Sequence, residues 1–299
     1  MKRWIRIGLV GVAGLALVAA MAVAAATWRG GQRLTQTLRP PVSRLQIPAD
    51  AAALARGRYL YAAIGCAGCH QADGAGRVLW DGGLTVLRSP QIAPGRGSAV
   101  TGYQGEDWVR AVRHGVGRNA TALLSMPSVD YQHLSDADLG AVAAYVGTLP
   151  PLDQAPRRHD ISWRFRALIG AGVVPLAPDL LVPGVQPAAA QAPAVTEAWG
   201  RYLAQTCVGC HGERLSGGKI PGLPPGTPPA ANLTAAADGA MTRYPTLAQF
   251  QAMLKSGRRP DGSKVAVMPF ESLSRLDDTD TAALYLHLKS LPARATGAD

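Results

Sequence analysis

A five-residue pattern, Cys-x-x-Cys-His, occurs twice in this chain and constrains it more than any other feature. It lies within GCAGCH at residues 65–70 and within TCVGCH at residues 206–211, and these two runs contain all four cysteines of the 299-residue sequence. A histidine therefore follows each cysteine pair directly. Any account of the chain has to explain why this arrangement is repeated.

Three common uses of cysteine pairs fit the arrangement poorly. Disulfides are frequent in exported proteins, but they need no histidine after each pair. Zinc fingers bring their second ligand pair a short way downstream, whereas 141 residues separate the two patterns here. Dithiols of the thioredoxin kind belong in strand-rich folds, and we find no strand patterns in this sequence. Each alternative leaves part of the pattern unexplained.

The run Cys-x-x-Cys-His is the signature of covalent c-type haem attachment. Two thiols at this spacing can form thioethers with the two vinyl groups of one porphyrin, and the adjacent imidazole then ligates the iron from one face. We therefore expect two covalently attached haem c groups. The expected attachment residues are Cys66, Cys69, Cys207 and Cys210, and the expected iron ligands are His70 and His211.

The region after each pattern is also repeated. At an offset of 142 without a gap, the residues Gly115, Met126, Pro127, Leu134, Asp136, Asp138, Leu149 and Pro150 recur as Gly257, Met268, Pro269, Leu276, Asp278, Asp280, Leu291 and Pro292. Such self-similarity indicates a duplicated unit. A methionine opposite histidine is a soft ligand that raises the potential of haem iron. We therefore expect Met126 and Met268 to be the second iron ligands.

The other methionines and histidines do not repeat in this way. Met241 and Met253 have no methionine counterpart, and we expect them to fill the core. Four histidines also lack a histidine counterpart and are expected to have surface or packing roles: His114, His133, His159 and His287.

Each copy is expected to be a small helical domain, which gives an all-α fold. Helical stretches precede the cysteines at 51–64 and 196–205, and Gly/Pro-rich segments such as 217–234 follow them as loops. A clear helix closes each copy, and Pro150 and Pro292 stop these two helices.

The closing helices carry the most specific local signals. Ser135 to Asp138 resembles a capping box with Asp in place of the usual Glu, and the second helix begins at Asp277. One face of the first closing helix is apolar, and it should cover the haem and the N-terminal helix of its copy. This face contains Leu139, Val142, Val146 and Leu149, and its counterpart contains Leu284, Leu288 and Leu291.

The N-terminus combines a cationic start, MKRWIR, with twenty uncharged residues at 7–26. At helical rise this length reaches about the ~30 Å of a bilayer core. The apolar region of a signal peptide usually has about 7–15 residues. We therefore expect one uncleaved transmembrane helix and exported haem domains. A signal peptide cleaved after Ala22-Val23-Ala24 is the alternative.

The positive charge of the chain is concentrated at the N-terminus. Residues 1–50 contribute +6, residues 51–155 contribute 0, and residues 156–194 and 195–299 contribute +2 each, which sums to the net +10. Binding of a nucleic acid duplex requires a basic surface on the folded part. We therefore exclude nucleic acid as a partner.

These features divide the chain into five expected parts. They are a membrane anchor at 1–30, a linker at 31–50, a first haem domain at 51–155, an interdomain linker at 156–194 and a second haem domain at 195–299. The interdomain linker begins with arginines among apolar residues and ends in a Pro/Ala-rich stretch. Its first part either docks on the membrane or a partner subunit, or packs between the two domains.

Each copy resembles a class I cytochrome c domain in its motifs, CAGCH with MP and CVGCH with MP. The pair resembles the membrane-anchored cytochrome c subunits of periplasmic alcohol, aldehyde or gluconate dehydrogenases, most closely in the run MPSVDYQHLSDADLGAVAAYVGTLPP at 126–151. The best-known members of that family carry three haems, whereas this chain has two haem motifs.

The resemblance implies an electron-transfer protein rather than an enzyme. It implies a place in the bacterial inner membrane with the haem domains in the periplasm. A dehydrogenase subunit would be the electron donor, and a quinone, a cytochrome or an oxidase would be the acceptor. A tethered shuttle or an oxidase-side subunit is the alternative. A dihaem peroxidase would need an open iron site, which Met126 and Met268 argue against.

Overall fold

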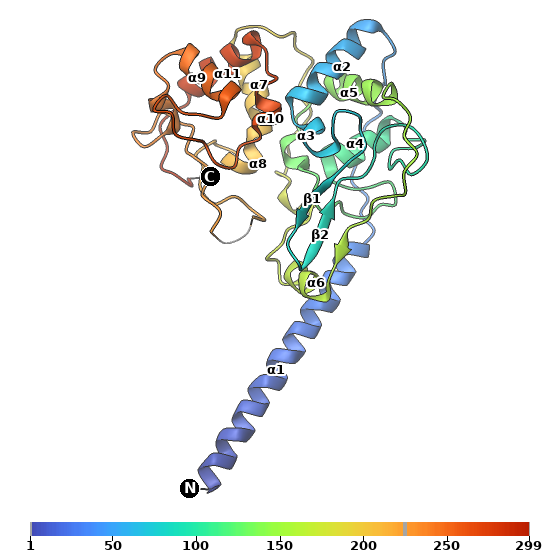
Figure 1. The fold of residues 1–299 in the computed structure, drawn as a ribbon, viewed down its shortest axis with the longest axis vertical. Helices are drawn as coiled ribbons and strands as arrows, with labels where there is room; N and C mark the ends of the chain where they lie inside the picture. Colours follow the sequence, from blue (N-terminus) through green and yellow to red (C-terminus); the bar gives the residue numbers. More distant parts are fainter. Residues whose placement is uncertain (1, 224–225, 299) are drawn as a thin grey trace.

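The computed structural model describes residues 2–223 and 226–298. Met1, Pro224, Pro225 and Asp299, which belong to the expected anchor, loop and second domain, lie outside the described residues. A long N-terminal helix leads into two lobes that lie side by side (Figure 1). Helices dominate both lobes, so the expected all-α fold class with two tandem units is confirmed.

The chain order of the elements repeats between the lobes. The first lobe follows helix α1 (Lys2–Thr35) and contains α2 (Ala51–Ala63), α3 (Cys66–His70), strands β1 (Val78–Asp81) and β2 (Thr85–Arg88), α4 (Gly105–His114), the 3-10 helix η1 (Ser128–Asp130) and α5 (Asp136–Gly147). The connecting segment contains β3 (Asp160–Ile161), α6 (Trp163–Gly170) and the 3-10 helix η2 (Ala177–Leu180). The second lobe contains α7 (Glu197–Ala204), η3 (Gln205–Cys207), α8 (Val208–His211), η4 (Ala240–Arg243), α9 (Leu247–Ser256), α10 (Phe270–Leu273) and α11 (Asp278–Ser290).

In each lobe the first and last helices cross at a glycine. A Cβ atom on Gly57 of α2 would lie 1.9 Å from the carbonyl oxygen of Ala141 on α5. A Cβ atom on Gly200 of α7 would lie 2.0 Å from the carbonyl oxygen of Ala283 on α11. Both crossings therefore require the backbones to approach more closely than any side chain allows.

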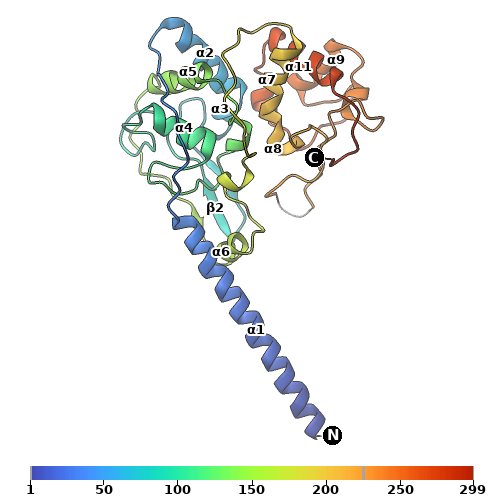
Figure 2. The same cartoon turned by 180° about the vertical axis from the view of Figure 1, so that it is seen from behind.

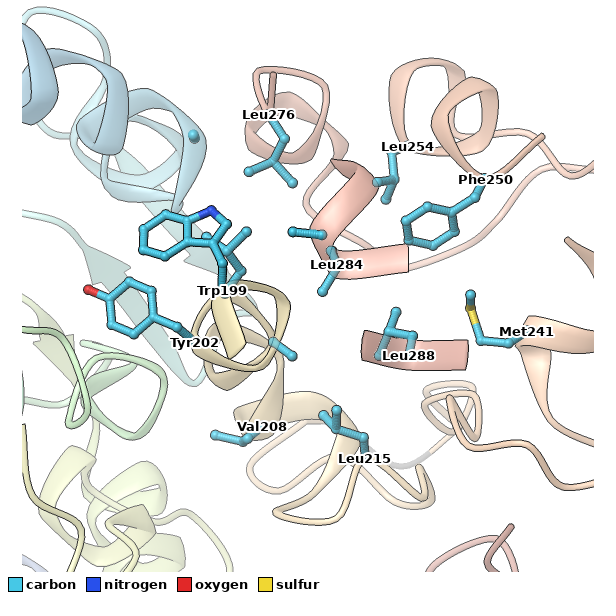
Figure 3. Packing of buried hydrophobic residues seen from close by; sticks show 14 of the residues in the cluster. Trp199, Tyr202, Val208, Leu215, Met241, Phe250, Leu254, Leu276, Leu284 and Leu288 are labelled. Carbon is cyan, nitrogen blue, oxygen red and sulfur yellow. The ribbon is translucent and has the colours of Figure 1, made fainter. Parts of the chain in front are cut away.

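The apolar faces of the closing helices form the cores of the two lobes, as expected. In the first lobe Leu139, Val142 and Val146 pack in one cluster with Leu60 and Tyr61 of α2. In the second lobe the buried cluster contains Trp199, Phe250, Leu284 and Leu288 (Figure 3). Met241 and Met253 are buried in that same cluster, so their expected role as core residues is confirmed.

Three short strands form in the described residues, although the sequence shows no strand pattern. β1 and β2 form an antiparallel hairpin, and β3 from the connecting segment adds to β2 with Thr85 opposite Ile161. The hydroxyl of Thr85 donates to the carbonyl oxygen of Asp160 at 2.7 Å. Each strand has at most four residues and its partner can lie about 75 residues away, so no alternating pattern long enough to detect is present.

The connecting segment packs against α1. Gly30 of α1 and Gly170 of α6 lie at the crossing, where a Cβ on either would be 1.9 Å from a carbonyl oxygen of the other helix. The guanidinium of Arg33 donates to the carbonyl oxygen of Ile169 at 2.9 Å and bonds the carboxylate of Asp179. Of the two alternatives left open for this part, packing between the two domains does not describe α6, which lies between α1 and the first lobe.

Helix α1 extends away from both lobes beyond this crossing (Figure 2). Residues 3–25 are exposed, whereas Gly30 is buried. By length and composition the helix from Arg3 to Thr35 can cross a membrane. A signal sequence near the N-terminus would have the same properties.

Candidate functional site

A cavity of about 320 Å³ in the first lobe is lined by all four residues that the first motif and its methionine predict. Cys66, Cys69 and His70 reach it from α3, and Met126 reaches it from the loop before η1. The cavity is otherwise mostly apolar, and the inner face of α5 contributes to its wall. The fold thus brings two thiols, an imidazole and a thioether to one apolar space.

The histidine of each motif is oriented by a backbone carbonyl. Nδ1 of His70 lies 3.0 Å from the carbonyl oxygen of Pro90, and Nδ1 of His211 lies 2.7 Å from that of Ala231. Burial lowers the pKa of both imidazoles, and the bond to the carbonyl opposes this only in part. A neutral ring that donates through Nδ1 keeps the Nε2 lone pair available for a metal.

The loops that follow the two histidines have the same backbone bonds. The N–H of Gly76 donates to the carbonyl oxygen of His70 at 2.9 Å, and the N–H of Gly217 donates to that of His211 at 2.8 Å. In the second lobe His211 is buried and Met268 is half-buried. The local framework of the second set therefore matches that of the first.

The four cysteines are free thiols in the described structure. Burial raises the pKa of Cys66 and of Cys207 to about 12, and it is also the main cause of the raised pKa of Cys69 and Cys210. The two thiols of the first motif lie at the wall of one mostly apolar cavity, which leaves room for an apolar group beside them. Together with the free Nε2 of His70 and the thioether of Met126, this donor set fits a c-type haem.

Two cavity residues were not predicted from the sequence. His159 of the connecting segment lines the first cavity, as does Arg88 of β2. The N–H of Arg88 donates to Nδ1 of His159 at 3.1 Å, which is a packing contact. The position of His159 in the cavity wall depends on the pairing of β3 with β2, and no repeat or motif marks it. The hydroxyl of Tyr131, also in the wall, donates to the carbonyl oxygen of Ile64 at 2.9 Å.

The other single histidines lie away from this wall. His133 is buried and its ring meets Tyr202 edge-on at a centroid distance of 5.3 Å. His287 is buried in the second lobe beside Glu197, and His114 is half-buried at the end of α4.

The two lobes meet through a pair of matched tyrosine contacts. The hydroxyl of Tyr59 donates to the carboxylate of Asp280 at 2.6 Å and accepts from the N–H of Asp277 at 3.1 Å. The hydroxyl of Tyr202 donates to the carboxylate of Asp138 at 2.7 Å and accepts from the N–H of Ser135 at 3.2 Å. Each tyrosine thus bonds the first turn of the closing helix in the other lobe. This reciprocity makes the interface pseudo-twofold.

The capping box predicted at Ser135 is only half formed, because Tyr202 takes one of its two hydrogen bonds. The Ser135 hydroxyl accepts from the N–H of Asp138 at 3.1 Å, but the Asp138 carboxylate does not return to the N–H of Ser135. The hydroxyl of Tyr202 takes that N–H instead and donates to Asp138. Arg56 is the second partner of Asp138, with contacts of 2.9 and 3.1 Å. A side chain from the other lobe has therefore been inserted into the box.

The interface also reaches the first cavity. Thr206 and Pro269 of the second lobe line it together with Asp130 of η1. Ile64 and Met126 of the first lobe are half-buried against the main cluster of the second lobe, at whose edge Trp199 and Tyr202 lie nearest the first lobe (Figure 3). The first candidate site is therefore bordered by residues of this interface, two of which belong to the second lobe.

Comparisons with known proteins agree with this arrangement of two sites. Residues 52–146 match the family described as cytochrome c oxidase, cbb3-type, subunit III, and residues 198–292 match the family described as cytochrome c. A diheme cytochrome c-type protein of Cereibacter sphaeroides is 31% identical over 272 residues, which cover 80% of this chain and 86% of that protein.

Two further relatives are named as parts of dehydrogenases. The gluconate 2-dehydrogenase cytochrome c subunit of Pantoea cypripedii is 32% identical over 281 residues, which cover 82% of this chain and 61% of that protein. The fructose dehydrogenase cytochrome subunit of Gluconobacter japonicus is 26% identical, with 87% of this chain and 57% of that protein covered. This chain thus spans about three fifths of the length of these two subunits.

The two matched families and these relatives show that two covalently bound haem c groups belong to the chain and that its role is electron transfer. The chain belongs to the dihaem c-type cytochromes.

Proposed function

We propose that this chain is the membrane-anchored electron-transfer subunit of a periplasmic dehydrogenase, and that it passes electrons to the respiratory chain through a quinone or a terminal oxidase. The observation that carries the proposal is the convergence of two thiols, one imidazole and one thioether in the first cavity. A histidine and a methionine that both ligate one iron would leave no open position for a substrate. This favours electron transfer over peroxide chemistry.

Each predicted site residue has a role in this function. Cys66, Cys69, Cys207 and Cys210 would attach the haems, and His70 with Met126 and His211 with Met268 would ligate the two irons. When bound, each haem supplies one-electron redox chemistry. The chain holds the ligands in buried or half-buried positions, with each imidazole oriented by a backbone carbonyl. Such fixed ligands need little rearrangement when the charge of the site changes.

We propose the same domain limits as those expected from the sequence. Residues 51–155 and 195–299 would form the haem domains, 31–50 and 156–194 the linkers, and 1–30 the anchor. Under this proposal α1 crosses the inner membrane with Arg3 and Arg6 on the cytoplasmic side. Both haem domains would then lie in the periplasm.

The packing of α6 against α1 favours a subunit held at one place over a mobile electron shuttle. The Gly30–Gly170 crossing and the bonds of Arg33 hold the first lobe against the end of α1. A shuttle needs a flexible tether to reach distant partners. A rigid attachment to α1 would instead keep the first haem site at a constant distance from the membrane surface.

The partner class comes from the relatives, whose names specify gluconate, fructose and alcohol dehydrogenases. We would measure haem absorbance in membranes with and without the gene, with the terminal oxidase blocked. Gluconate, fructose, ethanol and other sugars or aldehydes would be supplied in turn. We expect one substrate to reduce c-haem only when the gene is present. Reduction by dithionite but by no substrate would contradict a dehydrogenase partner.

A role at an oxidase is the second candidate, since residues 52–146 match an oxidase subunit family. It predicts that deletion of the gene lowers oxygen uptake with every respiratory substrate, including those whose dehydrogenases lack a cytochrome subunit. Loss of uptake with a single substrate would support the dehydrogenase role instead.

A further inference from the structure

In each lobe the turn after the Met-Pro pair reaches the haem motif of the other lobe. Asp130, at the end of η1 in the first lobe, accepts a hydrogen bond of 2.7 Å from the backbone N–H of Gly209. Gly209 is the residue between the two cysteines that directly precedes Cys210. A Cβ atom on Gly209 would lie 2.7 and 3.0 Å from the two carboxylate oxygens of Asp130. The carboxylate therefore fills the space beside the second haem motif that a side chain would occupy.

The equivalent approach to the first motif is made by a neutral group. Ser272 of α10 is the counterpart of Asp130 at the repeat offset of 142, and Gly68 is the counterpart of Gly209. A Cβ atom on Gly68 would lie 3.5 Å from the Ser272 hydroxyl oxygen. The two lobes therefore place side chains from equivalent positions beside the two motifs, a hydrogen-bonded carboxylate at Gly209 and a hydroxyl in van der Waals range at Gly68.

The surrounding charges increase this difference. Asp130 lies close enough to Cys207 and Cys210 for its charge to act on both. Cys69 instead lies near Arg77 and Glu271, whose side chains face each other at 3.7 Å. The second motif thus has an unbalanced negative neighbour, whereas the first has a charge pair of opposite signs.

We propose that Asp130 gives the haem site of the second lobe the lower reduction potential of the two, so that electrons pass from the second lobe to the first. A nearby negative charge stabilises the oxidised iron, which carries one more positive charge than the reduced iron. The inference rests on the proposed function and adds a direction to it. Transfer from the second lobe to the first also agrees with the position of the first lobe, because α1 and α6 attach that lobe to the anchor.

The charge can be removed while the contact is kept. In Asp130→Asn the amide oxygen can still accept the N–H of Gly209, so the geometry of the interface is preserved. Burial raises the pKa of Asp130 to about 7, against the opposing effect of the Gly209 bond, so titrations should be run at about pH 8.5, where the carboxylate is ionised. Conversely, Ser272→Asp adds the missing charge beside the first motif.

The test is a spectroscopic redox titration of the detergent-solubilised full chain with both haems attached. Met126→His and Met268→His assign the two waves, because each should displace the wave of its own lobe. We expect Asp130→Asn to raise the equilibrium constant for reduction of the second haem about tenfold. This corresponds to a reduction potential higher by about 59 mV for a one-electron couple. Ser272→Asp should lower the potential of the first haem. The double variant Asp130→Ser with Ser272→Asp should reverse the order of the two potentials.

A control variant at an exposed carboxylate separates the effect of Asp130 from a general effect of charge. Asp81→Asn removes an exposed carboxylate in the β1–β2 turn region and should leave both waves in place. The inference is overturned if Asp130→Asn moves neither wave, moves only the first wave, or moves both equally. Ser272→Asp alone still tests it if the double variant does not fold. The membrane assay with dehydrogenase substrates is independent of these titrations, so failure of one does not imply failure of the other.

Discussion

The two lobes are copies of one unit, and the comparison between them separates what haem attachment requires from what each position in the chain requires. Both lobes have a glycine at the crossing of the first and last helices, a histidine held by a carbonyl and a tyrosine that bonds the other lobe. They differ in their surroundings. The first lobe carries the β1–β2 hairpin and is attached to α1 through α6. The second lobe has the larger buried cluster. The shared features therefore describe the haem unit, and the differences describe its place in an electron path.

The differences at the interface lie mainly in charge. Asp138 is held by the guanidinium of Arg56, whereas its counterpart Asp280 accepts from the indole N–H of Trp199 at 2.6 Å. Arg56 and Trp199 occupy equivalent positions and face each other, with the guanidinium carbon 5.3 Å from the ring centroid. A duplicated interface has thus kept its geometry while its charges diverged. Substitutions at equivalent positions of the two lobes can measure how far the two halves remain equivalent.

The largest effect is expected from removal of one attachment motif. In Cys207→Ala with Cys210→Ala the second lobe loses both thioethers, and the chain should keep only the first haem. Cys66→Ala with Cys69→Ala should keep only the second. Covalent haem per protein, measured on the denatured chain, should fall by half in either case. Loss of both haems from either variant would show that the lobes do not mature independently.

The next effect concerns the helix crossings. Gly57→Val and Gly200→Val each drive a side chain into a backbone carbonyl at about 2 Å, so each should lower the free energy of unfolding of its own lobe by about 3 kcal/mol, the upper end of the range for overpacking. Denaturant unfolding followed by haem absorbance measures this. Gly147→Ala, where a Cβ meets nothing within 4 Å, is the matched control on α5. Equal loss in Gly147→Ala would contradict the close-approach argument.

The third prediction concerns the axial methionines. Met126→His and Met268→His should each lower the potential of one haem, on the order of 100 mV within the ~0.8 V range that axial ligands span. The reason is that imidazole stabilises the oxidised iron better than a thioether does. Redox titration gives both shifts in one experiment. His159→Asn is the control for the first lobe, and a larger shift there than in Met126→His would identify His159 as the ligand.

The smallest effect is expected at the tyrosine contacts. Tyr59→Phe and Tyr202→Phe each remove a buried hydroxyl bonded to a carboxylate and to a backbone N–H, which should cost about 1–3 kcal/mol of stability. We expect the larger cost for Tyr59→Phe, because Asp280 then keeps only the neutral partner Trp199, whereas Asp138 keeps the guanidinium of Arg56.

The matched control for this pair is Tyr285→Phe. The hydroxyl of Tyr285 donates to Tyr244 and Pro245 within the second lobe, at 3.1 and 2.9 Å. Its loss should leave the contact between the lobes unchanged, which limited proteolysis of the connecting segment can report. Equal proteolysis of Tyr59→Phe and Tyr285→Phe would argue that the tyrosine contacts do not hold the lobes together.

Much of the haem unit could be predicted because its signals lie within short stretches of sequence. The spacing of Cys66, Cys69 and His70 is set by the porphyrin, and the 142-residue offset pointed to Met126, which the fold brings to the same cavity. Asp277 caps α11 through the N–H of Asp280 at 2.8 Å, as its position before an apolar stripe predicted. In each case the partners are near in sequence or tied to one cofactor.

The features that join the lobes could not be predicted in this way. The pairing of β3 with β2, the position of His159, the tyrosine inserted at Ser135 and the carboxylate of Asp130 at Gly209 all depend on which surfaces dock. Their partners lie tens to hundreds of residues apart, and a single side chain shows no periodicity. The sequence alone determined two haem units and a long apolar helix. Only the tertiary structure decided how the units face each other, because that depends on the shape and charge of whole surfaces rather than on spacing along the chain.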